Sequence, residues 1–269
     1  MRIRILGSGS KGNSCLIQTD RALFLLDNGF SGKEITRRLE SLEINPKHIN
    51  GIIVSHDHSD HVGGAGIFAR RFHTPIYINH LTYQRSHKAL AKTEVRFFET
   101  GGTIEYKDLL VGTFPLPHDA ADPVGFVFRR KNGDSNSKTV GYVTDIGQVT
   151  DLVRQKLKNI SALVIEANHD ETMLLNGPYP YKTKQRVRGR YGHLSNRHSG
   201  QLISELVELT GIDEVTIAHL SENNNDPLLA KETILQTVEE NLNKIIQVHI
   251  ASQSKPMEND IIIPKESSK

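Results

Sequence analysis

Ser55-His56-Asp57-His58-Ser59-Asp60-His61 is the stretch of this sequence that decides its fold and its chemistry. Three histidines and two carboxylates fall within six consecutive positions, a density that packing alone does not explain. Neutral imidazole and ionised carboxylate are ligands of divalent metals, above all zinc and also manganese or iron. In a loop after a buried strand, His56 and His58 can turn to one side and Asp60 and His61 to another, so one loop can serve two adjacent metals. A polar surface loop rich in histidine is the alternative.

Three further candidate ligands lie later in the chain. His118, Asp145 and His219 each come at the end of a hydrophobic run that we expect to be a strand. Taken singly, each is typical of a capping or surface group. Because polar residues at strand ends converge on one edge of a sheet, we expect the three together to supply the ligands that the first loop lacks.

Strands and helices follow one another along the chain without strict alternation. This order favours a layered α/β sandwich over a doubly wound parallel sheet. No linker rich in Pro, Gly or Ser divides the sequence, so we expect one domain over residues 1–269. Helices are expected over Ser31–Leu42 and His61–Phe72, Lys131–Asp134 is expected to form a hairpin turn, and residues 267–269 are expected to fray.

The composition is that of an ordinary globular protein, with 37% hydrophobic and 24% charged residues in 269. The longest apolar run is the five residues Ala22–Leu26. A membrane-spanning helix needs about twenty, so we expect no membrane partner. Met1–Leu6 alternates polar and apolar residues, as a first strand does, and lacks the continuous apolar core of a signal peptide. The single cysteine, Cys15, excludes a disulfide framework, and the cytoplasm is the expected location.

Positive charge is concentrated in one part of the chain. The net charge is only +2, but residues 176–200 contain six cations and no acidic residue, which leaves the remainder at −4. Such a segment is either a solvated basic surface or the footprint of a polyanion. Its cations are Lys182, Lys184, Arg186, Arg188, Arg190 and Arg197.

The His-x-His-x-Asp-His loop, followed by a later His, Asp and His, resembles the signature of the metallo-β-lactamase superfamily. The resemblance implies a four-layer αββα sandwich and two divalent metals, most often zinc, with manganese or iron as alternatives. Asp27 matches an early aspartate of the superfamily that orients a ligand histidine. Histidine at position 58, where the di-iron flavoproteins of the superfamily have glutamate, favours hydrolysis over redox chemistry. The resemblance assigns His56, His58 and His118 to one metal, Asp60, His61 and His219 to the other, and Asp145 to a bridge.

Three short stretches narrow the resemblance to the YycJ (WalJ) family of bacterial hydrolases. They are Leu6–Asn13, Gly192–Asn196 and Ala218–Ser221. This resemblance implies a cytoplasmic exonuclease that digests DNA from 5′ to 3′ and is linked to a two-component regulatory locus of the cell wall. We therefore expect nucleic acid as the partner, with DNA favoured over RNA, and leave a homodimer open.

Two residues are candidates for proton transfer in such a reaction. Asp60 lies among the ligands and can take the proton of the attacking water. His193 follows the basic segment and can bind the phosphate and protonate the leaving oxygen. A histidine at the entry of a helix, with Ser195 or Asn196 as the cap, is the alternative. The residues expected to bind substrate are Lys182, Lys184, Arg186, Arg188, Arg190, Ser195 and Asn196.

Other functions use the same metals. A small-molecule phosphodiesterase is one alternative. A thioester or lactone hydrolase is another, but a thioesterase has no need of a basic segment or of His193. Processing of transfer-RNA 3′ ends is a third option, and the chain shows no long arm for gripping tRNA. A non-catalytic regulator is disfavoured, because buried unpaired His and Asp are costly to retain without metal. Glu166, which ends another hydrophobic run, receives no ligand role here because the ligand set is already complete.

Overall fold

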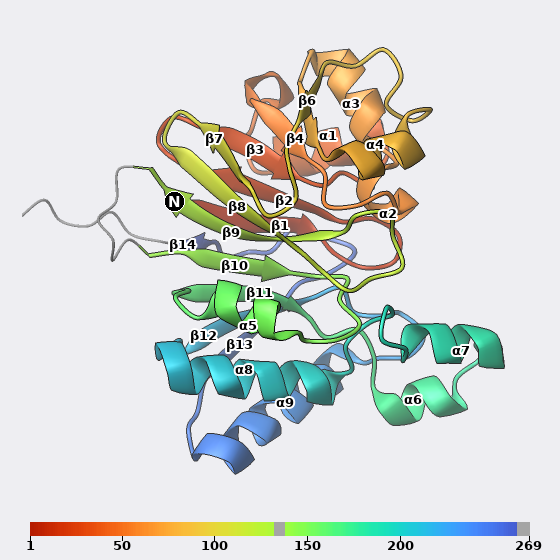
Figure 1. Cartoon of the computed structure of the whole chain (residues 1–269), viewed down its shortest axis with the longest axis vertical. Helices are drawn as coiled ribbons and strands as arrows, with labels where there is room; N and C mark the ends of the chain where they lie inside the picture. The colour runs from red at the N-terminus through yellow and green to blue at the C-terminus, as the bar shows by residue number, and fades with distance from the viewer. Residues whose placement is uncertain (132–137, 263–269) are drawn as a thin grey trace, which may run out of the picture.

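The computed structural model describes residues 1–131 and 138–262, and these form four layers. Two seven-stranded sheets face each other, and helices cover the outer face of each sheet (Figure 1). The predicted αββα sandwich is therefore confirmed. Within the described residues, no helix combines the length and the apolar character that crossing a membrane requires.

The first sheet comes mainly from the first hundred residues. Its strands run in the order β14-β1-β2-β3-β4-β5-β6, antiparallel from β14 to β3 and parallel from β3 to β6. The strands are β1 Arg2–Gly7, β2 Ser14–Gln18, β3 Leu23–Leu26, β4 Gly51–Ile53, β5 Ile76–Ile78, β6 Val95–Phe97 and β14 Ile261–Ile262. Helices α1 (Gly32–Glu40), α3 (Ala65–Phe72) and α4 (His80–Ser86) lie on its side of the molecule, with the 3-10 turn η1 (Pro46–His48) beside α1 (Figure 1).

The second sheet comes from the rest of the chain. Its order is β13-β12-β11-β10-β9-β8-β7, with antiparallel pairs from β7 to β10 and parallel pairs from β10 to β13. Helices α5 (Asp151–Leu157), α8 (Asn196–Thr210) and α9 (Pro227–Leu242) cover its outer face (Figure 1). The strands are β7 Thr103–Tyr106, β8 Leu109–Pro115, β9 Val124–Arg130, β10 Val140–Val143, β11 Ala162–Glu166, β12 Glu214–Ala218 and β13 Gln247–Ile250.

Three hydrophobic clusters fill the spaces between the layers. Successive residues of β11 show how the strands build them: Val164 joins the cluster between the sheets, while Leu163 and Ile165 join the cluster under α5, α8 and α9. In the first sheet, Phe24 points inward and Leu25 packs toward α1 and α3 in the same way. The central strands are buried on both faces, which is why they read as continuous apolar runs rather than alternating ones.

Several local predictions differ from the structure. The expected helix over 61–72 is two helices, α2 (Ser59–Val62) and α3, because the chain turns at Gly63 and Gly64. A side chain at Gly64 would overlap the carbonyl of Phe30, so the chain comes too close there for any other residue. The predicted hairpin turn at 131–134 lies outside the described residues from residue 132 onward. The predicted frayed end at 267–269 lies wholly outside them.

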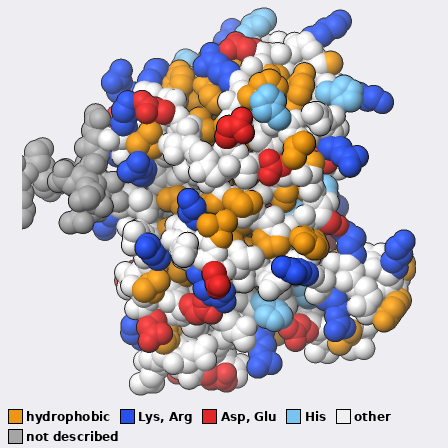
Figure 2. All heavy atoms as spheres, viewed as in Figure 1, with side chains coloured by type: hydrophobic (Ala, Val, Ile, Leu, Met, Phe, Trp, Pro, Cys, Tyr) orange, Lys and Arg blue, Asp and Glu red, His pale blue; other side chains and the backbone are white. Residues whose placement is uncertain are grey.

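The basic segment is folded as well. The chain between β11 and α8 forms α6 (Glu171–Asn176) and α7 (Tyr181–Val187), which extend beyond the end of the two sheets (Figure 1). Lys and Arg side chains gather with a few hydrophobic ones over this part of the surface (Figure 2). These two helices were not predicted, since six or seven residues give too short a pattern for the helical period.

A substitution at Gly29 tests how closely the loop after β3 packs against the loop after β4. A methyl group at Gly29 would overlap the backbone of Asp60. We expect Gly29→Ala to lower the free energy of unfolding by about 1–3 kcal/mol, measured by urea denaturation, because the two loops must separate. Gly112→Ala is the matched control, since its methyl group would lie 3.8 Å from the nearest atom, the carbonyl oxygen of Val127. Equal stabilities of the two variants would refute the close packing.

Candidate metal centre

The candidate site lies where both sheets end. In the first sheet, Asp27 follows β3 and His56 follows β4, while in the second His118 follows β8, Asp145 follows β10 and His219 follows β12. These strands run in the directions that bring their carboxyl ends to one side of the sandwich. The topology therefore gathers polar residues that lie up to 192 positions apart (219 − 27).

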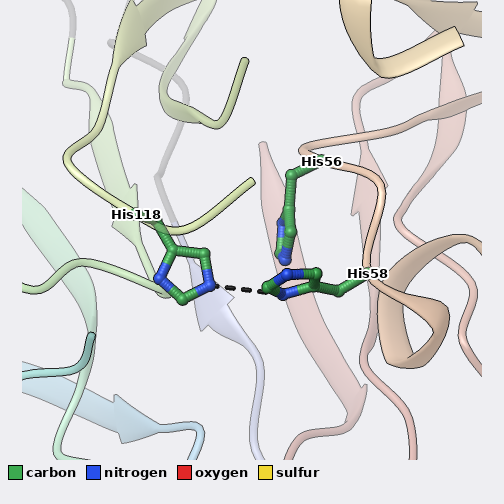
Figure 3. Close-up of side chains that lie close together, drawn as sticks. All are labelled: His56, His58 and His118. Carbon is green, nitrogen blue, oxygen red and sulfur yellow. Dashed lines mark hydrogen bonds between the residues drawn. The ribbon is translucent and has the colours of Figure 1, made fainter. Parts of the chain in front are cut away.

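One group of three histidines is shown in Figure 3. Ligand atoms of His56, His58 and His118 all lie within 4.8 Å of one another. Nε2 of His118 is 3.3 Å from Nδ1 of His58, and the other nitrogen of His118, Nδ1, is 2.9 Å from the carbonyl oxygen of Gly192. That carbonyl fixes the ring of His118 so that Nε2 points at the other two histidines.

A second group adjoins the first. Atoms of Asp60, His61 and His219 lie within 4.8 Å of one another, and Oδ2 of Asp60 is 3.5 Å from Nε2 of both histidines. Asp145 stands between the groups. Its carboxylate oxygens are 3.3 Å from His61 Nε2, 3.4 Å from His219 Nε2 and 3.8 Å from His118 Nε2. The structure thus brings together all seven residues that the sequence singled out as ligands.

Asp27 holds this arrangement from behind. Its Oδ2 accepts a hydrogen bond from the hydroxyl of Ser55 at 2.8 Å and lies 2.8 Å from Nδ1 of His61, while Oδ1 accepts one from the backbone N–H of Ser55 at 2.7 Å. The hydroxyl of Ser55 is also 2.9 Å from Nδ1 of His56. One buried carboxylate therefore orients a histidine of each group, directly for His61 and through Ser55 for His56.

The backbone is strained at three of these residues. Asp27, Asp145 and His219 have φ angles of 58°, 61° and 54°, in the left-handed region that residues other than glycine seldom adopt. Such strain persists only where surrounding contacts over-determine it, and it gathers at functional sites. Each of these angles turns a side chain from the end of its strand into the common site.

Several buried polar atoms of the site have no hydrogen-bond partner among the described residues. They are Nε2 of His56, both ring nitrogens of His219 and Oδ2 of Asp145. Burial, reinforced by the neighbouring imidazoles, also lowers the pKa of His56 well below its usual value, so this ring is neutral near pH 7. Unpaired buried polar atoms are costly, and neutral nitrogens beside a carboxylate oxygen are the donor set that divalent cations prefer. The residues present therefore fit a metal pair.

The other half of the site carries negative charge. Burial would raise the pKa of the Asp60 carboxyl, but the contact with His219, whose Nε2 is 3.5 Å from Oδ2, and the charges of His219 and His61 hold it well below its usual range. Burial would likewise lower the pKa of His61, yet the carboxylates of Asp145 and Asp27 outweigh it and raise the pKa to about 9. The carboxylates stabilise positive charge at this position, which a bound cation would supply in place of a proton.

Glu166 is a residue of the site to which the sequence analysis gave no role. It is completely buried at the end of β11 and accepts hydrogen bonds from the backbone N–H groups of Asp145, Ile146 and Leu194 at 2.8–3.1 Å. Its Oε2 also lies 3.1 Å from Nδ1 of His193. Glu166 thus ties the loop of Asp145 to the loop of His193. It ends a hydrophobic run, so the rule that found Asp145 also applies to Glu166.

Asp119, the residue after His118, was missed for lack of any signal in the sequence. Its Oδ1 is 3.3 Å from Nε2 of His118, and its Oδ2 accepts a hydrogen bond from Arg186 at 2.8 Å. Burial would raise the pKa of the Asp119 carboxyl, but the hydrogen bond from Arg186 and the charge of His118 outweigh burial and lower the pKa below its usual value. This ion pair places one cation of α7 beside the histidine group.

The remaining predicted residues lie in several settings. Arg186 and His193 line a cavity of about 170 Å³ together with Asp60, Asp145 and His219. Lys184 instead donates to the carbonyl of Leu175 at 2.7 Å, and Lys182 and Arg190 are exposed. Arg188, also exposed, lines a neighbouring cavity.

Ser195 and Asn196 have structural partners. Ser195 is the N-cap of α8, where its hydroxyl accepts from the backbone N–H of His198, so the alternative role considered for it is present. The amide of Asn196 is buried and exchanges two hydrogen bonds of 2.9 Å with that of Asn225. That pairing ties the start of α8 to the loop before α9.

Comparison with known proteins agrees with this geometry. The model of the metallo-β-lactamase superfamily matches residues 7–150. The exodeoxyribonuclease YycJ of Bacillus anthracis is 32% identical over 243 residues, which are 89% of this chain and 90% of that protein. The exodeoxyribonuclease WalJ of Streptococcus pneumoniae is 35% identical over 237 residues, 86% of each chain. The crystal structure of Zn²⁺-bound PqqB from Methylobacterium extorquens has a TM-score of 0.69 at 16% identity, covering 96% of this chain and 100% of that one.

The fold and the histidine and aspartate groups define a metal-dependent hydrolase. The chain belongs to the metallo-β-lactamase superfamily and, within it, to the family of the YycJ and WalJ proteins. Proteins of this fold bind divalent metals, and the two groups of ligands are where this chain can do so.

Asp27→Asn tests the support behind the ligands. The amide keeps the shape of the side chain and tolerates the left-handed backbone, but it removes the charge that orients His61. We expect zinc affinity to fall about 10- to 100-fold, measured by chelator competition. Asp108→Asn is the control, because Asp108 is also buried but bonds Thr19 at the other end of β3. Equal zinc affinities of Asp27→Asn and the wild type would contradict the role of Asp27.

Proposed function

We propose that this chain is one hydrolase domain over residues 1–269 that cuts phosphodiester bonds in nucleic acid, removing nucleotides from the 5′ ends of DNA. The observation that carries the proposal is the two groups of ligands joined by Asp145, with Arg186 at their mouth. The YycJ and WalJ relatives, named as exodeoxyribonucleases, support the choice of DNA over RNA. We place the activity in the cytoplasm and propose no partner other than nucleic acid, with a homodimer left open.

The ligand groups suit two divalent ions, with zinc favoured by the nitrogen-rich donor set and manganese or iron as alternatives. His56, His58 and His118 would hold one ion, and Asp60, His61 and His219 the other, with Asp145 between them. Such a pair of ions activates water for attack and neutralises charge on a phosphate. The chain must then position the substrate and move two protons.

Asp60 and His193 are suited to those proton transfers. The carboxylate of Asp60 stays ionised and takes the proton of the water as its oxygen bonds to phosphorus. As the bond between phosphorus and the 3′ oxygen breaks, His193 donates a proton to that oxygen. Glu166 binds Nδ1 of His193 at 3.1 Å, which leaves Nε2 for the substrate. Glu166 is therefore the positioning residue of the proposed acid.

The basic segment supports a polymeric substrate. Arg186 reaches the mouth of the metal centre and Arg188 a cavity next to it, so a phosphate chain crossing α7 would meet both. Tyr181 and Tyr191 are exposed beside these cations and can stack on bases. Lys182, Lys184 and Arg190 add charge without a fixed position at the ligands. The same features disfavour a thioester or lactone as the substrate, and they favour a nuclease over a small-molecule phosphodiesterase.

Digestion of end-labelled strands tests the proposal directly. Zinc- or manganese-loaded protein should release mononucleotides stepwise from the 5′ end of DNA and act more slowly on RNA of the same sequence. Asp145→Asn should lower the rate by at least a hundredfold, since it removes the shared charge between the ligand groups while the amide tolerates the left-handed backbone. Turnover of a chromogenic phosphodiester with strands left intact would contradict the nuclease and favour the small-molecule enzyme.

Salt dependence tests the role of α7. The logarithm of the association constant falls linearly with the logarithm of the salt concentration. For single strands, each phosphate contact that is lost makes this slope shallower by about 0.7. We expect Arg186→Gln combined with Arg188→Gln to make the slope about 1.4 shallower, measured by fluorescence anisotropy. Arg71→Gln with Arg85→Gln removes the same charge from exposed sites on α3 and α4 and should leave the slope unchanged. Equal slopes for the two double variants would exclude α7 from the binding surface.

A further inference from the structure

A second cavity shares His193 with the cavity at the metal centre. Its volume is about 260 Å³, and His193 borders both this cavity and the one that holds Asp60, Asp145 and His219. None of the proposed metal ligands lines the second cavity. Apart from His193 and Arg188, the residues that line it therefore have no part in the reaction as described so far.

The walls are fixed by contacts between segments far apart in the sequence. The chain after β11 pairs with the start of α8, where the backbone N–H of Asn196 donates to the carbonyl of His169 at 2.9 Å. His169 is 2% exposed, and its Nδ1 has no hydrogen-bond partner among the described residues. Fixed backbone contacts therefore bound the cavity, and one residue of its lining has a buried polar atom without a partner among the described residues.

The lining is mixed in chemistry. Leu174 and Leu175 of α6 form an apolar wall, and imidazoles of His169 and His198 form another. The hydroxyl of Ser195 lies 3.0 Å from the carboxylate of Glu171, which also lines the cavity. Arg188 lines the same cavity and offsets the charge of Glu171. The flat imidazoles, the leucines and the hydrogen-bonding groups suit a nucleobase with its sugar.

We infer that this cavity binds the terminal nucleoside of the strand, while the phosphate that follows it reaches the metal centre past His193. The inference rests on the proposed nuclease function. It places the 3′ oxygen of that nucleoside at the boundary between the cavities, beside the imidazole that protonates it. Because ligand pockets usually measure about 300–1,000 Å³, a cavity of about 260 Å³ has room for one small unit. The cavity therefore sets the length of the product at one nucleotide.

Calorimetry with three probes tests the assignment without requiring turnover. Thymidine 3′-monophosphate, whose phosphate follows the nucleoside through its 3′ oxygen as in the proposed complex, thymidine and inorganic phosphate are titrated into the metal-loaded protein. The nucleotide should bind at least tenfold more tightly than phosphate, and thymidine alone should bind measurably. Leu175→Gln removes an apolar wall at a residue that is 55% exposed, so the fold tolerates it, and should reduce the advantage of the nucleotide over phosphate to threefold or less. Leu209→Gln, at an exposed leucine of α8 outside the cavity lining, is the control and should leave the advantage unchanged.

The outcomes separate this inference from the proposed function. Equal binding of the nucleotide and phosphate, or an advantage that Leu175→Gln does not reduce, overturns the nucleoside cavity even if strands are digested. Intact strands together with nucleotide binding that depends on Leu175 overturn the nuclease and leave the cavity assigned to a free mononucleotide. Digestion that yields dinucleotides from the wild type would contradict the proposed limit on product length.

Discussion

The burial of imidazoles and carboxylates with too few hydrogen-bond partners is the constraint on which the rest of the structure depends. His56, Asp145 and His219 are nearly inaccessible to solvent, yet each keeps an unpaired polar atom. A core can carry such atoms only if something else stabilises them, and bound cations do so while the apo fold bears the cost. The two sheets offset that cost in the apo fold, because their strands are buried on both faces at a distance from the site.

Two buried carboxylates keep this arrangement in register. Asp27 binds His61 and Ser55 in the first sheet, and Glu166 binds the loops of Asp145 and His193 in the second. Each accepts backbone N–H donors as well as contacting a ring, so it fixes the loop and the side chain together. Buried networks of this kind are rigid when every member is satisfied. The precision of the site therefore comes from the carboxylates behind the ligands as much as from the ligands themselves.

Short patterns in the sequence predicted a layered sandwich and the gathering of the ligands: apolar runs indicate buried strands, and a polar residue stands where each run ends. The four-layer order was implied by the resemblance of the His-x-His-x-Asp-His loop. Glu166 also stands where an apolar run ends, but it received no role because seven other residues already formed a complete ligand set. Asp119 could not have been found, since its importance comes from a contact with Arg186, 67 positions away. The helices α6 and α7 were missed because their length is too short to show a period, and tertiary contacts such as Lys184 with Leu175 stabilise them.

The position of α6 and α7 separates two tasks within one fold. The strand ends of the two sheets fix the residues suited to metals. The segment between β11 and α8 extends past the sheets (Figure 1). It contributes Arg186 to one cavity and Arg188 to the other. Changes there alter the surface that a substrate meets and leave the strands of the core in place. Low identity to a structure of the same fold, such as 16% for PqqB, is therefore compatible with sheets of the same architecture.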